Sequence, residues 1–313
     1  MSVVLLAANA AGVARAVDAL GRGQLVILPT ETVYGLAADA TNGAVVARIY
    51  AVKGRPWINP LIAHVCDLDH AERHAVFDSR ARELALRFWP GPLTIVAPRR
   101  PDSAVSLLAL AGLDTIALRC PADSAFQAVL RRLDRPICAP SANRSGRLSP
   151  TAAADAAADF AAPDVALALD HGPCRLGVES TILALMPGEP PRLLRPGALA
   201  RGEIEAVIGP LAAAGDGVQA PGMLASHYAP NAALRLNADG LEPDELMLGF
   251  GVVDGDLNLS LSGDLHEAAA NLFAYLRALD ARGAARIAVA PIPCEGLGEA
   301  INDRLARAAA PRT

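Results

Sequence analysis

The chain has 313 residues, of which 52% are hydrophobic and 19% charged, as expected for a folded globular protein and not for a disordered one. Its formal net charge of −5 arises in residues 233–313, which hold 7 Arg against 12 Asp and Glu, while residues 1–232 are balanced. This charge distribution argues against a protein that binds nucleic acid through its overall charge. The sequence also lacks the ~18-residue apolar stretch that a membrane span needs.

Helix-like and strand-like segments alternate along the chain, which predicts an α/β protein. The first predicted helix covers residues 10–20, and it is followed by a buried strand over 25–28 and a second helix over 42–52. Further strands are predicted over 61–65, 93–98, 115–121, 136–140 and 180–185. The alanine-rich run after Pro150 predicts another helix, with Ser149 as its N-cap and Pro150 at its first position.

The pattern weakens after Arg201, and residues 209–223 are rich in Gly, Ala and Pro, which is typical of a linker. Beyond them, a strand over 246–251, a long helix, a strand over 286–291 and a last helix predict a small βαβα unit. The long helix is marked by Leu265, Leu272, Leu276 and Leu279. We therefore predict two domains, residues 1–208 and 233–313, joined by a connection over 209–232.

The cysteines indicate the compartment. Cys66, Cys120, Cys138, Cys174 and Cys294 are an odd number without a CxxC pair, which argues for a reducing cytoplasm and against a disulfide scaffold or a zinc site. The start of the chain, "MSVVLLAANAAGVA", is apolar but lacks the basic residues that open a signal peptide. We expect a cytoplasmic protein.

Lys53 is the only lysine, although the chain has 28 Lys and Arg in total. It stands in the last turn of a predicted helix, before Gly54, so one interpretation is ordinary helix-ending chemistry. Arginine would serve that purpose equally well, whereas a site that needs a compact point charge would exclude it. Arg55, Asn59 and His64 follow closely, and a polyanion is the natural partner of such a group.

Two polar loops follow predicted strands. Thr30, Glu31 and Thr32 come directly after the strand over 25–28, where α/β sheets hold ligands, although Thr30 could instead cap the next turn. The loop "APSANRSGRLSPT", residues 139–151, offers hydroxyl and backbone N–H groups at a predicted helix start, which favours an anion. A generic Ser/Asn-rich turn is the alternative. Because no GK[ST] occurs, an ordinary P-loop NTPase is excluded.

Other motifs point in several directions. Arg119 stands at a strand end and Arg195 before a Pro-Gly turn; Arg119, on its apolar strand, needs an anion, either a ligand or a structural carboxylate such as Glu179. His70 and His74 in "HAERH" are one helical turn apart, but the Glu is misplaced for HExxH, and we predict a solvated helix face. Neither GxSxG nor GxGxxG occurs, which argues against a serine hydrolase elbow and a Rossmann dinucleotide site.

Taken together, "LPTETVYGLAADA", "KGRPWINPLIAHV", "WPGPLTIV", "IALRCP", "APSANRSGRLSPT", "ESTI" and "RPG" resemble the YrdC/Sua5 family over nearly the whole chain. "APGMLASHYAP", residues 220–230, resembles the linker of the two-domain Sua5 branch. The resemblance implies a large twisted-sheet domain with a concave ligand surface and a small Rossmann-like α/β C-terminal domain. It also implies an L-threonylcarbamoyladenylate synthase, a nucleotidyltransferase that joins L-threonine, bicarbonate and ATP for the t6A modification of tRNA.

The resemblance also assigns residues. The expected catalytic tetrad is Lys53, Arg55, Ser141 and Asn143. The residues expected to hold ATP are Arg55, Asn59, Thr115, Ser141, Ser149, Arg195 and Tyr228. Those expected to hold threonine are Thr32, His64, Arg119, Ala139 and Ser180, while His227 and Tyr228 are expected to form a lid. Pro140 stands where many relatives have Thr, which removes one hydroxyl near the ligand.

The family chemistry needs no protein nucleophile. The threonine amine and bicarbonate form a carbamate whose oxygen attacks the α-phosphate as pyrophosphate leaves, so the protein aligns reactants and neutralises growing charge. We expect Lys53 to face the phosphates or the carbamate, Arg55 and Arg195 to clamp phosphates, and Arg119 to pair with the threonine carboxylate. Mg²⁺ is expected on the phosphates, without a metal site made by protein ligands.

Two other functions stay open at this point. An RNA-binding module could use the same Arg-lined sheet without chemistry, although residues 1–232 carry no net charge and offer few aromatic platforms for bases. A related carbamoyl-adenylate enzyme of hydrogenase maturation would need further modules that this chain lacks. For the preferred function we expect a downstream tRNA threonylcarbamoyltransferase as partner, and neither tight nucleic-acid binding nor membrane association.

Overall fold

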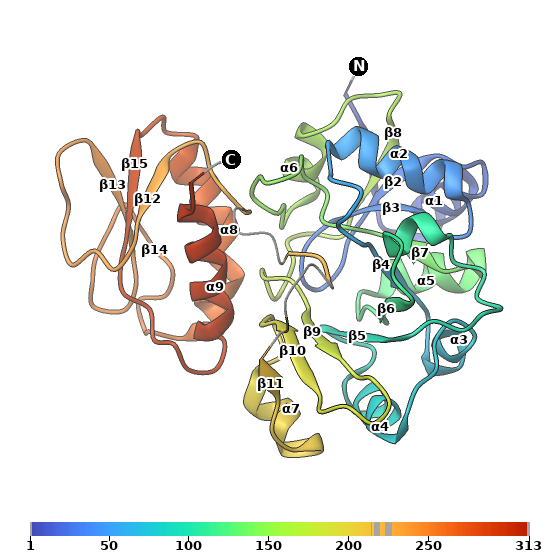
Figure 1. Ribbon diagram of the computed structural model, residues 1–313. Coiled ribbons are helices and arrows are strands. Elements are labelled where there is room, and N and C mark those ends of the chain that lie inside the picture. Colours follow the sequence, from blue (N-terminus) through green and yellow to red (C-terminus); the bar gives the residue numbers. More distant parts are fainter. Residues whose placement is uncertain (1, 214, 216–219, 223–226, 312–313) are drawn as a thin grey trace.

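The computed structural model describes residues 2–213, 215, 220–222 and 227–311. Parts of the expected linker, residues 214, 216–219 and 223–226, therefore lie outside the described residues. The described chain forms two sheets, one of eleven strands and one of four. In Figure 1 the small sheet lies at the far left, and helices α8 and α9 stand between it and the larger part of the molecule.

The large sheet is mixed, with the strand order β1-β8-β2-β3-β7-β4-β6-β5-β9-β10-β11. Its strands are β1 (Val4–Ala7), β2 (Leu25–Leu28), β3 (Gly35–Asp39), β4 (Ile62–His64), β5 (Leu93–Pro98), β6 (Thr115–Arg119), β7 (Ile137–Cys138), β8 (Val165–Asp170), β9 (Thr181–Ala184), β10 (Arg192–Arg195) and β11 (Ala212–Ala213). Strand β2 is buried at every position and β5 at all but the last, as their unbroken apolar sequences predict.

Helices alternate with the strands of the large sheet along the chain. They are α1 (Ala10–Gly21), α2 (Gly43–Lys53), α3 (Leu68–Glu72), α4 (Ser79–Phe88), the 3₁₀ turn η1 (Leu107–Leu110), α5 (Ser124–Leu133), α6 (Ala153–Ala158) and α7 (Arg201–Ile208). Asn42 caps the start of α2 and Gly54, at a φ of 64°, ends it, so Lys53 is its last residue. The position of this helix therefore determines where Lys53 lies in the fold.

The small sheet is wholly parallel, with the order β12-β15-β13-β14. Its elements are β12 (Ala233–Arg235), β13 (Glu245–Gly249), β14 (Leu257–Asn258), α8 (Leu265–Asp280), β15 (Arg286–Val289) and α9 (Gly298–Ala309). The α/β class and the two-part organisation predicted from the sequence are confirmed. The simple βαβα unit is corrected, because β12 and β14 are too short to leave a periodic signal.

The two parts share apolar packing. Val33, Leu148 and Val178 of the large part belong to the same buried cluster as Leu272 and Phe273 of α8. Helix α7 ends at Ile208, and β11, which lies inside the expected linker, pairs with β10 of the large sheet. No helix in the described residues is both long and apolar enough to cross a membrane.

One predicted helix start is wrong. Helix α6 begins at Ala153 with Ala152 as its N-cap, not with Ser149 and Pro150. The reason is that distant groups occupy this segment: the Ser149 hydroxyl donates to Glu179, and the Pro150 carbonyl accepts from the Tyr34 N–H at 2.9 Å. Ser149 is therefore tied to a loop near β9 and does not serve as a helix cap.

Candidate functional site

The ends of several strands of the large sheet open into one hollow, whose described part has a volume of about 50 Å³. Strands β4 and β6 run parallel with His64 opposite Arg119, so their last residues reach this hollow together. The predicted site residues that line it from the large part are Arg55, His64, Arg119, Ala139, Ser141, Ser180 and Arg195. Those that line it from the linker are His227 and Tyr228.

Arg119 meets a carboxylate that the sequence left open. Its Nη2 lies 2.7 Å from Oε1 of Glu31 and donates to the Thr32 hydroxyl at 2.9 Å, and all three side chains are buried. The other oxygen of Glu31 accepts from the Ala122 N–H at 3.0 Å. Glu31, and not Glu179, is thus the acid that neutralises Arg119.

Arg55 and Arg195 are different, because in the described residues neither forms an ion pair with a carboxylate. Arg55 donates to the carbonyls of Asn59 at 3.2 Å and Pro60 at 2.9 Å. Arg195 donates to the Ser180 carbonyl at 2.8 Å. Burial lowers the pKa of Arg55 to about 10 and also lowers that of Arg195. Arg195 also donates to the Ser180 hydroxyl at 3.3 Å. Two buried guanidinium groups that have only uncharged partners in the described chain, at one hollow, indicate a site for an anion.

Lys53 lies behind the hollow and does not line it. Lys53 is 3% exposed, and its ammonium group donates to the carbonyls of Ser141 at 2.6 Å and of Asn143. Burial, followed by the nearby charge of Arg55, lowers its pKa well below the usual value. An ammonium has three donors, so holding the 141–143 loop leaves one of them available to a ligand.

The two imidazoles of the hollow are neutral. Burial lowers the pKa of His64 to about 3, with the charge of Arg119 as a second cause, and burial lowers that of His227 to about 3. His64 stacks on Phe126 of α5, with 5.1 Å between ring centroids, and its Nδ1 lies 3.2 Å from the Ile137 carbonyl. They therefore act as polar walls and hydrogen-bonding groups, not as cations.

Several site residues carry buried polar atoms without a hydrogen-bond partner. Among the described residues, these atoms include both amide atoms of Asn59, Nε of Arg119, Oδ1 of Asn143 and Nδ1 of His227. Buried polar atoms are almost always paired in folded proteins. Their concentration around this hollow indicates groups that wait for a ligand.

The linker closes the hollow. Tyr228 is buried at a left-handed φ of 63°, and its neighbour Ala229 donates its N–H to the Gly146 carbonyl at 2.8 Å. Gly222 lies so close that a Cβ there would stand 2.8 Å from the Tyr228 hydroxyl. Pockets for drug-sized ligands measure roughly 300–1,000 Å³, so the hollow is smaller than such a pocket where the described residues line it.

Other predicted residues lie outside the lining. Thr32, Asn59, Asn143 and Ser149 are buried beside the hollow. Thr115 opens β6 and lines a different hollow with Asp114 and Arg192, about 13 Å along the strand from Arg119 at roughly 3.3 Å per residue. The structure does not bring Thr115 to the other site residues.

Sequence reasoning missed Arg304, Pro221 and Gly222, and it did not see the partners of Glu31 and Glu179. A signal for Arg304 did exist. It falls on the buried face of α9 at helical spacing with Ala300, Ile301 and Leu305, where an apolar residue is expected. An arginine in an apolar stripe is a sign of a buried ionic partner.

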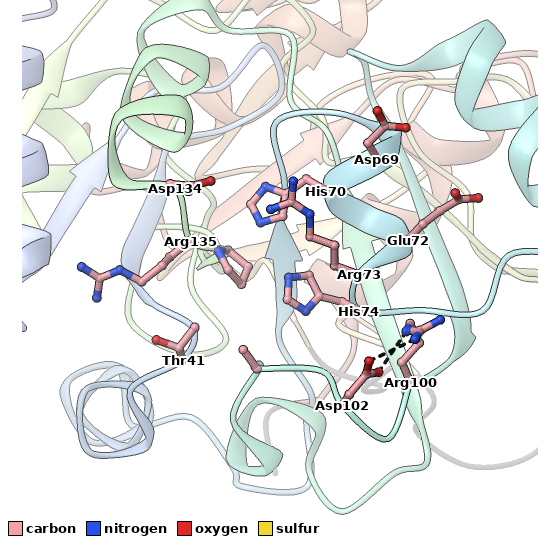
Figure 2. A pocket seen from close by; sticks show the side chains of 12 residues that line it. Thr41, Asp69, His70, Glu72, Arg73, His74, Arg100, Asp102, Asp134 and Arg135 are labelled. Atoms are coloured by element: carbon pink, nitrogen blue, oxygen red, sulfur yellow. Dashed lines mark hydrogen bonds and ion pairs between the residues drawn. The ribbon is translucent and has the colours of Figure 1, made fainter.

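The His70/His74 prediction is wrong, because both residues are buried. Nδ1 of His70 lies 3.3 Å from the Cys66 thiol, and Nδ1 of His74 lies 3.1 Å from the Ser103 hydroxyl. Figure 2 shows both rings beside a wider hollow of about 610 Å³, which Arg73 and Asp134 also line. Helix α3 ends at Glu72, so His74 lies beyond it and the two rings do not share one solvated helix face.

Family models match both parts of the chain. Residues 18–197 match a family model described as "Telomere recombination", which groups Sua5, YciO and YrdC, and residues 199–310 match "Threonylcarbamoyl-AMP synthase, C-terminal domain". The threonylcarbamoyl-AMP synthase of Pyrococcus abyssi is 40% identical and covers 91% of this chain and 90% of its own length. The Bacillus subtilis protein of the same name is 37% identical and covers 98% of this chain and 95% of its own.

A solved structure is also similar. P. abyssi Sua5 complexed with L-threonine superposes with a TM-score of 0.89 at 37% identity, covering 98% of this chain and 96% of its own. The superposition therefore includes both the large and the small part of this chain. The chain belongs to the YrdC/Sua5 family, in its two-domain Sua5 branch.

Proposed function

We propose that this protein is an L-threonylcarbamoyladenylate synthase, a nucleotidyltransferase that makes threonylcarbamoyl-AMP and pyrophosphate from L-threonine, bicarbonate and ATP. One observation carries the proposal: Arg55 and Arg195, buried and without carboxylate partners in the described chain, face one hollow. The relatives named for this activity and the relative solved with L-threonine support the choice of substrates.

In this reaction the threonine amine attacks the carbon of bicarbonate, and loss of water leaves a carbamate. A carbamate oxygen then attacks the α-phosphorus, and the bond to the bridging oxygen breaks as pyrophosphate leaves. Arg55 and Arg195 would bind the phosphates, and the free third donor of Lys53 would reach the oxygens that gain charge. Holding both reactants in line can supply several kcal/mol of the barrier reduction, so no protein nucleophile is needed.

The threonine would lie where Arg119, Thr32 and Ser180 meet. The Nε of Arg119 is buried and unpaired, so it can bind the substrate carboxylate while Nη2 stays on Glu31. The Ser180 hydroxyl lies 2.8 Å from that of Thr94, and the Thr32 hydroxyl lies 2.8 Å from that of Thr30. The Thr30 hydroxyl donates to the Val33 carbonyl, so Thr32 donates to Thr30 and can only accept from the substrate. Ser180 can donate to the substrate when Thr94 donates to Ser180.

ATP would enter as its Mg²⁺ complex. Glu31 and Glu179 are the carboxylates nearest the hollow among the described residues, and both are already occupied by Arg119 and Arg304. A metal therefore has to travel with the triphosphate, which is consistent with the habit of Mg²⁺ of keeping few protein ligands. The five unpaired cysteines support a reducing cytoplasm as the compartment. The proposed product implies a tRNA threonylcarbamoyltransferase as the enzyme that consumes it.

The decisive experiment measures pyrophosphate release by the full chain. We expect release that requires threonine and bicarbonate together, with threonylcarbamoyl-AMP recovered by mass spectrometry. Release without threonine would point to another carbamoyl-adenylate enzyme. Absence of turnover combined with RNA binding that weakens steeply with salt would favour the non-catalytic RNA-binding module.

A further inference from the structure

Glu179 is an acid in the wall of a hollow whose chemistry suits an anion. It lines the hollow and is 6% exposed. A carboxylate beside a triphosphate repels it, and the repulsion is strong where water is excluded. The charge of Glu179 must therefore be balanced by a cation that the triphosphate does not use.

That cation comes from the other domain. Nε of Arg304, on α9, lies 2.7 Å from Oε2 of Glu179, although 125 residues separate them in the chain. Arg304 is 1% exposed, so the pair is shielded from solvent. Figure 1 shows α9 on the side of the small domain that faces the large one.

The same pair reaches two residues of the proposed nucleotide site. Oε1 of Glu179 accepts from the Ser149 hydroxyl at 2.6 Å. The guanidinium carbon of Arg304 stands 5.1 Å from the ring centroid of Tyr228, close enough for a cation–π contact. Nη2 of Arg304 also donates to the Pro196 carbonyl at 3.0 Å, directly after Arg195.

Electrostatics agrees with this geometry. Burial alone would raise the pKa of Glu179, but the charges of Arg304 and Arg195 and the Ser149 hydrogen bond lower it to about 2. Glu179 is therefore ionised at neutral pH. Without Arg304, the carboxylate of Glu179 would lose its ion-pair partner and would draw on Arg195, a residue expected to bind the triphosphate.

We propose that Arg304 is a positioning residue of the active site that the C-terminal domain supplies: it neutralises Glu179, so that Ser149, Arg195 and Tyr228 can receive a triphosphate. This proposal rests on the proposed function. It assigns the C-terminal domain a part in nucleotide binding beyond covering the site.

The test uses three variants of the full chain: Arg304→Met, Glu179→Gln and the two combined. Binding of α,β-methylene-ATP, which cannot release pyrophosphate, is measured by calorimetry, and the KM for ATP and for threonine is measured in parallel. We expect Arg304→Met to weaken analogue binding by about tenfold or more, because breaking a buried pair leaves one charge uncompensated. Arg304 also pairs with Asp303, which keeps Arg307 as a partner at 3.0 Å when Arg304 is replaced. The combined variant removes both charges of the Arg304–Glu179 pair and should return to within about threefold of the wild type.

A matched control is available on the same helix. Glu299 of α9 pairs with Arg201 of α7, also at 2.7 Å and also between the two parts, but neither residue lines the hollow. Glu299→Gln should leave analogue binding and the KM for ATP unchanged. Circular dichroism and thermal melting establish that each variant is folded.

Two results would overturn the proposal. One is unchanged analogue binding in a folded Arg304→Met variant. The other is a combined variant that binds the analogue no better than Arg304→Met alone, because removing the charge of Glu179 should end its repulsion of the triphosphate. If the wild type binds the analogue but makes no threonylcarbamoyl-AMP, the proposed function fails, while the binding comparison still decides the role of Arg304.

Discussion

Lys53 forms hydrogen bonds to the backbone of two other expected site residues, Ser141 and Asn143. Its ammonium is buried and contacts the carbonyls of Ser141 and Asn143, and no described carboxylate forms an ion pair with it. A compact ammonium fits between two carbonyls of one loop and still projects a third donor. A planar guanidinium is larger and directs its donors in a fixed fork, which explains why an arginine-rich chain keeps a lysine here.

We therefore expect Lys53→Arg to reduce threonylcarbamoyl-AMP formation by at least about tenfold while the protein stays folded, because the loop that carries Ser141 and Asn143 has to move to admit the larger group. Pyrophosphate release and near-ultraviolet circular dichroism measure the two effects. Arg48→Lys is a control on the outer part of the same helix, where the side chain binds only carbonyls at the surface. Activity of Lys53→Arg within about twofold of the wild type would contradict the special role of this lysine.

His64 links the site to pH-dependent stability. Burial and then the charge of Arg119 lower its pKa from 6.5 to about 3, so between these values the unfolded chain binds a proton that the folded chain does not. The free energy of unfolding therefore falls as the pH drops below 6.5, and His64 alone accounts for about 2 kcal/mol between pH 6.5 and pH 5.

In a His64→Gln variant this loss should disappear, because glutamine can still bond to the Ile137 carbonyl but does not titrate. Urea unfolding of the wild type and the variant at pH 7 and pH 5 measures the difference. An equal loss of stability in both proteins would show that His64 is protonated in the folded state.

At the scale of elements, the domain contact depends on close backbone approach. Gly177 has a φ of 71°, and a Cβ on it would lie 2.3 Å from the Ala269 carbonyl oxygen and 2.4 Å from Cα of Ala270, both on α8. Because those atoms are helix backbone, they cannot rotate away. Glycine is thus required both by the left-handed conformation and by the approach of α8.

We expect Gly177→Ala to lower the free energy of unfolding by clearly more than the penalty for a left-handed alanine. It should also loosen the contact between α8 and the large domain. Gly188→Ala separates the two causes, since Gly188 has a φ of 75° but open space around its Cα. That control should cost about 1 kcal/mol, the usual penalty for a left-handed alanine. Thermal melting and limited proteolysis of the linker provide the measurements, and equal effects of both substitutions would refute the packing argument.

Elements defined by local sequence were predictable, and elements defined by distant partners were not. Strands β2 and β5 have the predicted bounds because an unbroken apolar run is enough to identify a buried strand. Strand β14 has two residues and exists only because β13 pairs with it. In the same way, Ser149 looked like a helix cap, but its hydroxyl is taken by Glu179, a residue 30 positions further along the chain.

Considered as a whole, the molecule builds its site from both domains. The strand ends of the large sheet supply Arg119 and Arg195, and the loop after α2 supplies Arg55. The linker supplies Tyr228, and α9 supplies Arg304 behind Glu179. The residues recognised from family motifs lie in the first group and in the linker. Arg304 could not be assigned from sequence because its function depends on how α9 docks against the large domain.

This arrangement leads to a prediction for a shortened chain that ends at residue 208. The large sheet keeps all of its strands except the two-residue β11, so we expect a folded domain, although Val33, Leu148 and Val178 lose the apolar cover of α8. Synthesis should be impaired, because the fragment lacks Tyr228 and leaves Glu179 without Arg304. Adding Glu179→Gln to the fragment should then improve ATP binding, since it removes the uncompensated charge without restoring the lid. Full turnover by the unsubstituted fragment would contradict both the lid role of Tyr228 and the neutralisation of Glu179 by Arg304. Impaired synthesis without a gain from Glu179→Gln would contradict the role of Arg304 alone and attribute the loss to the missing lid.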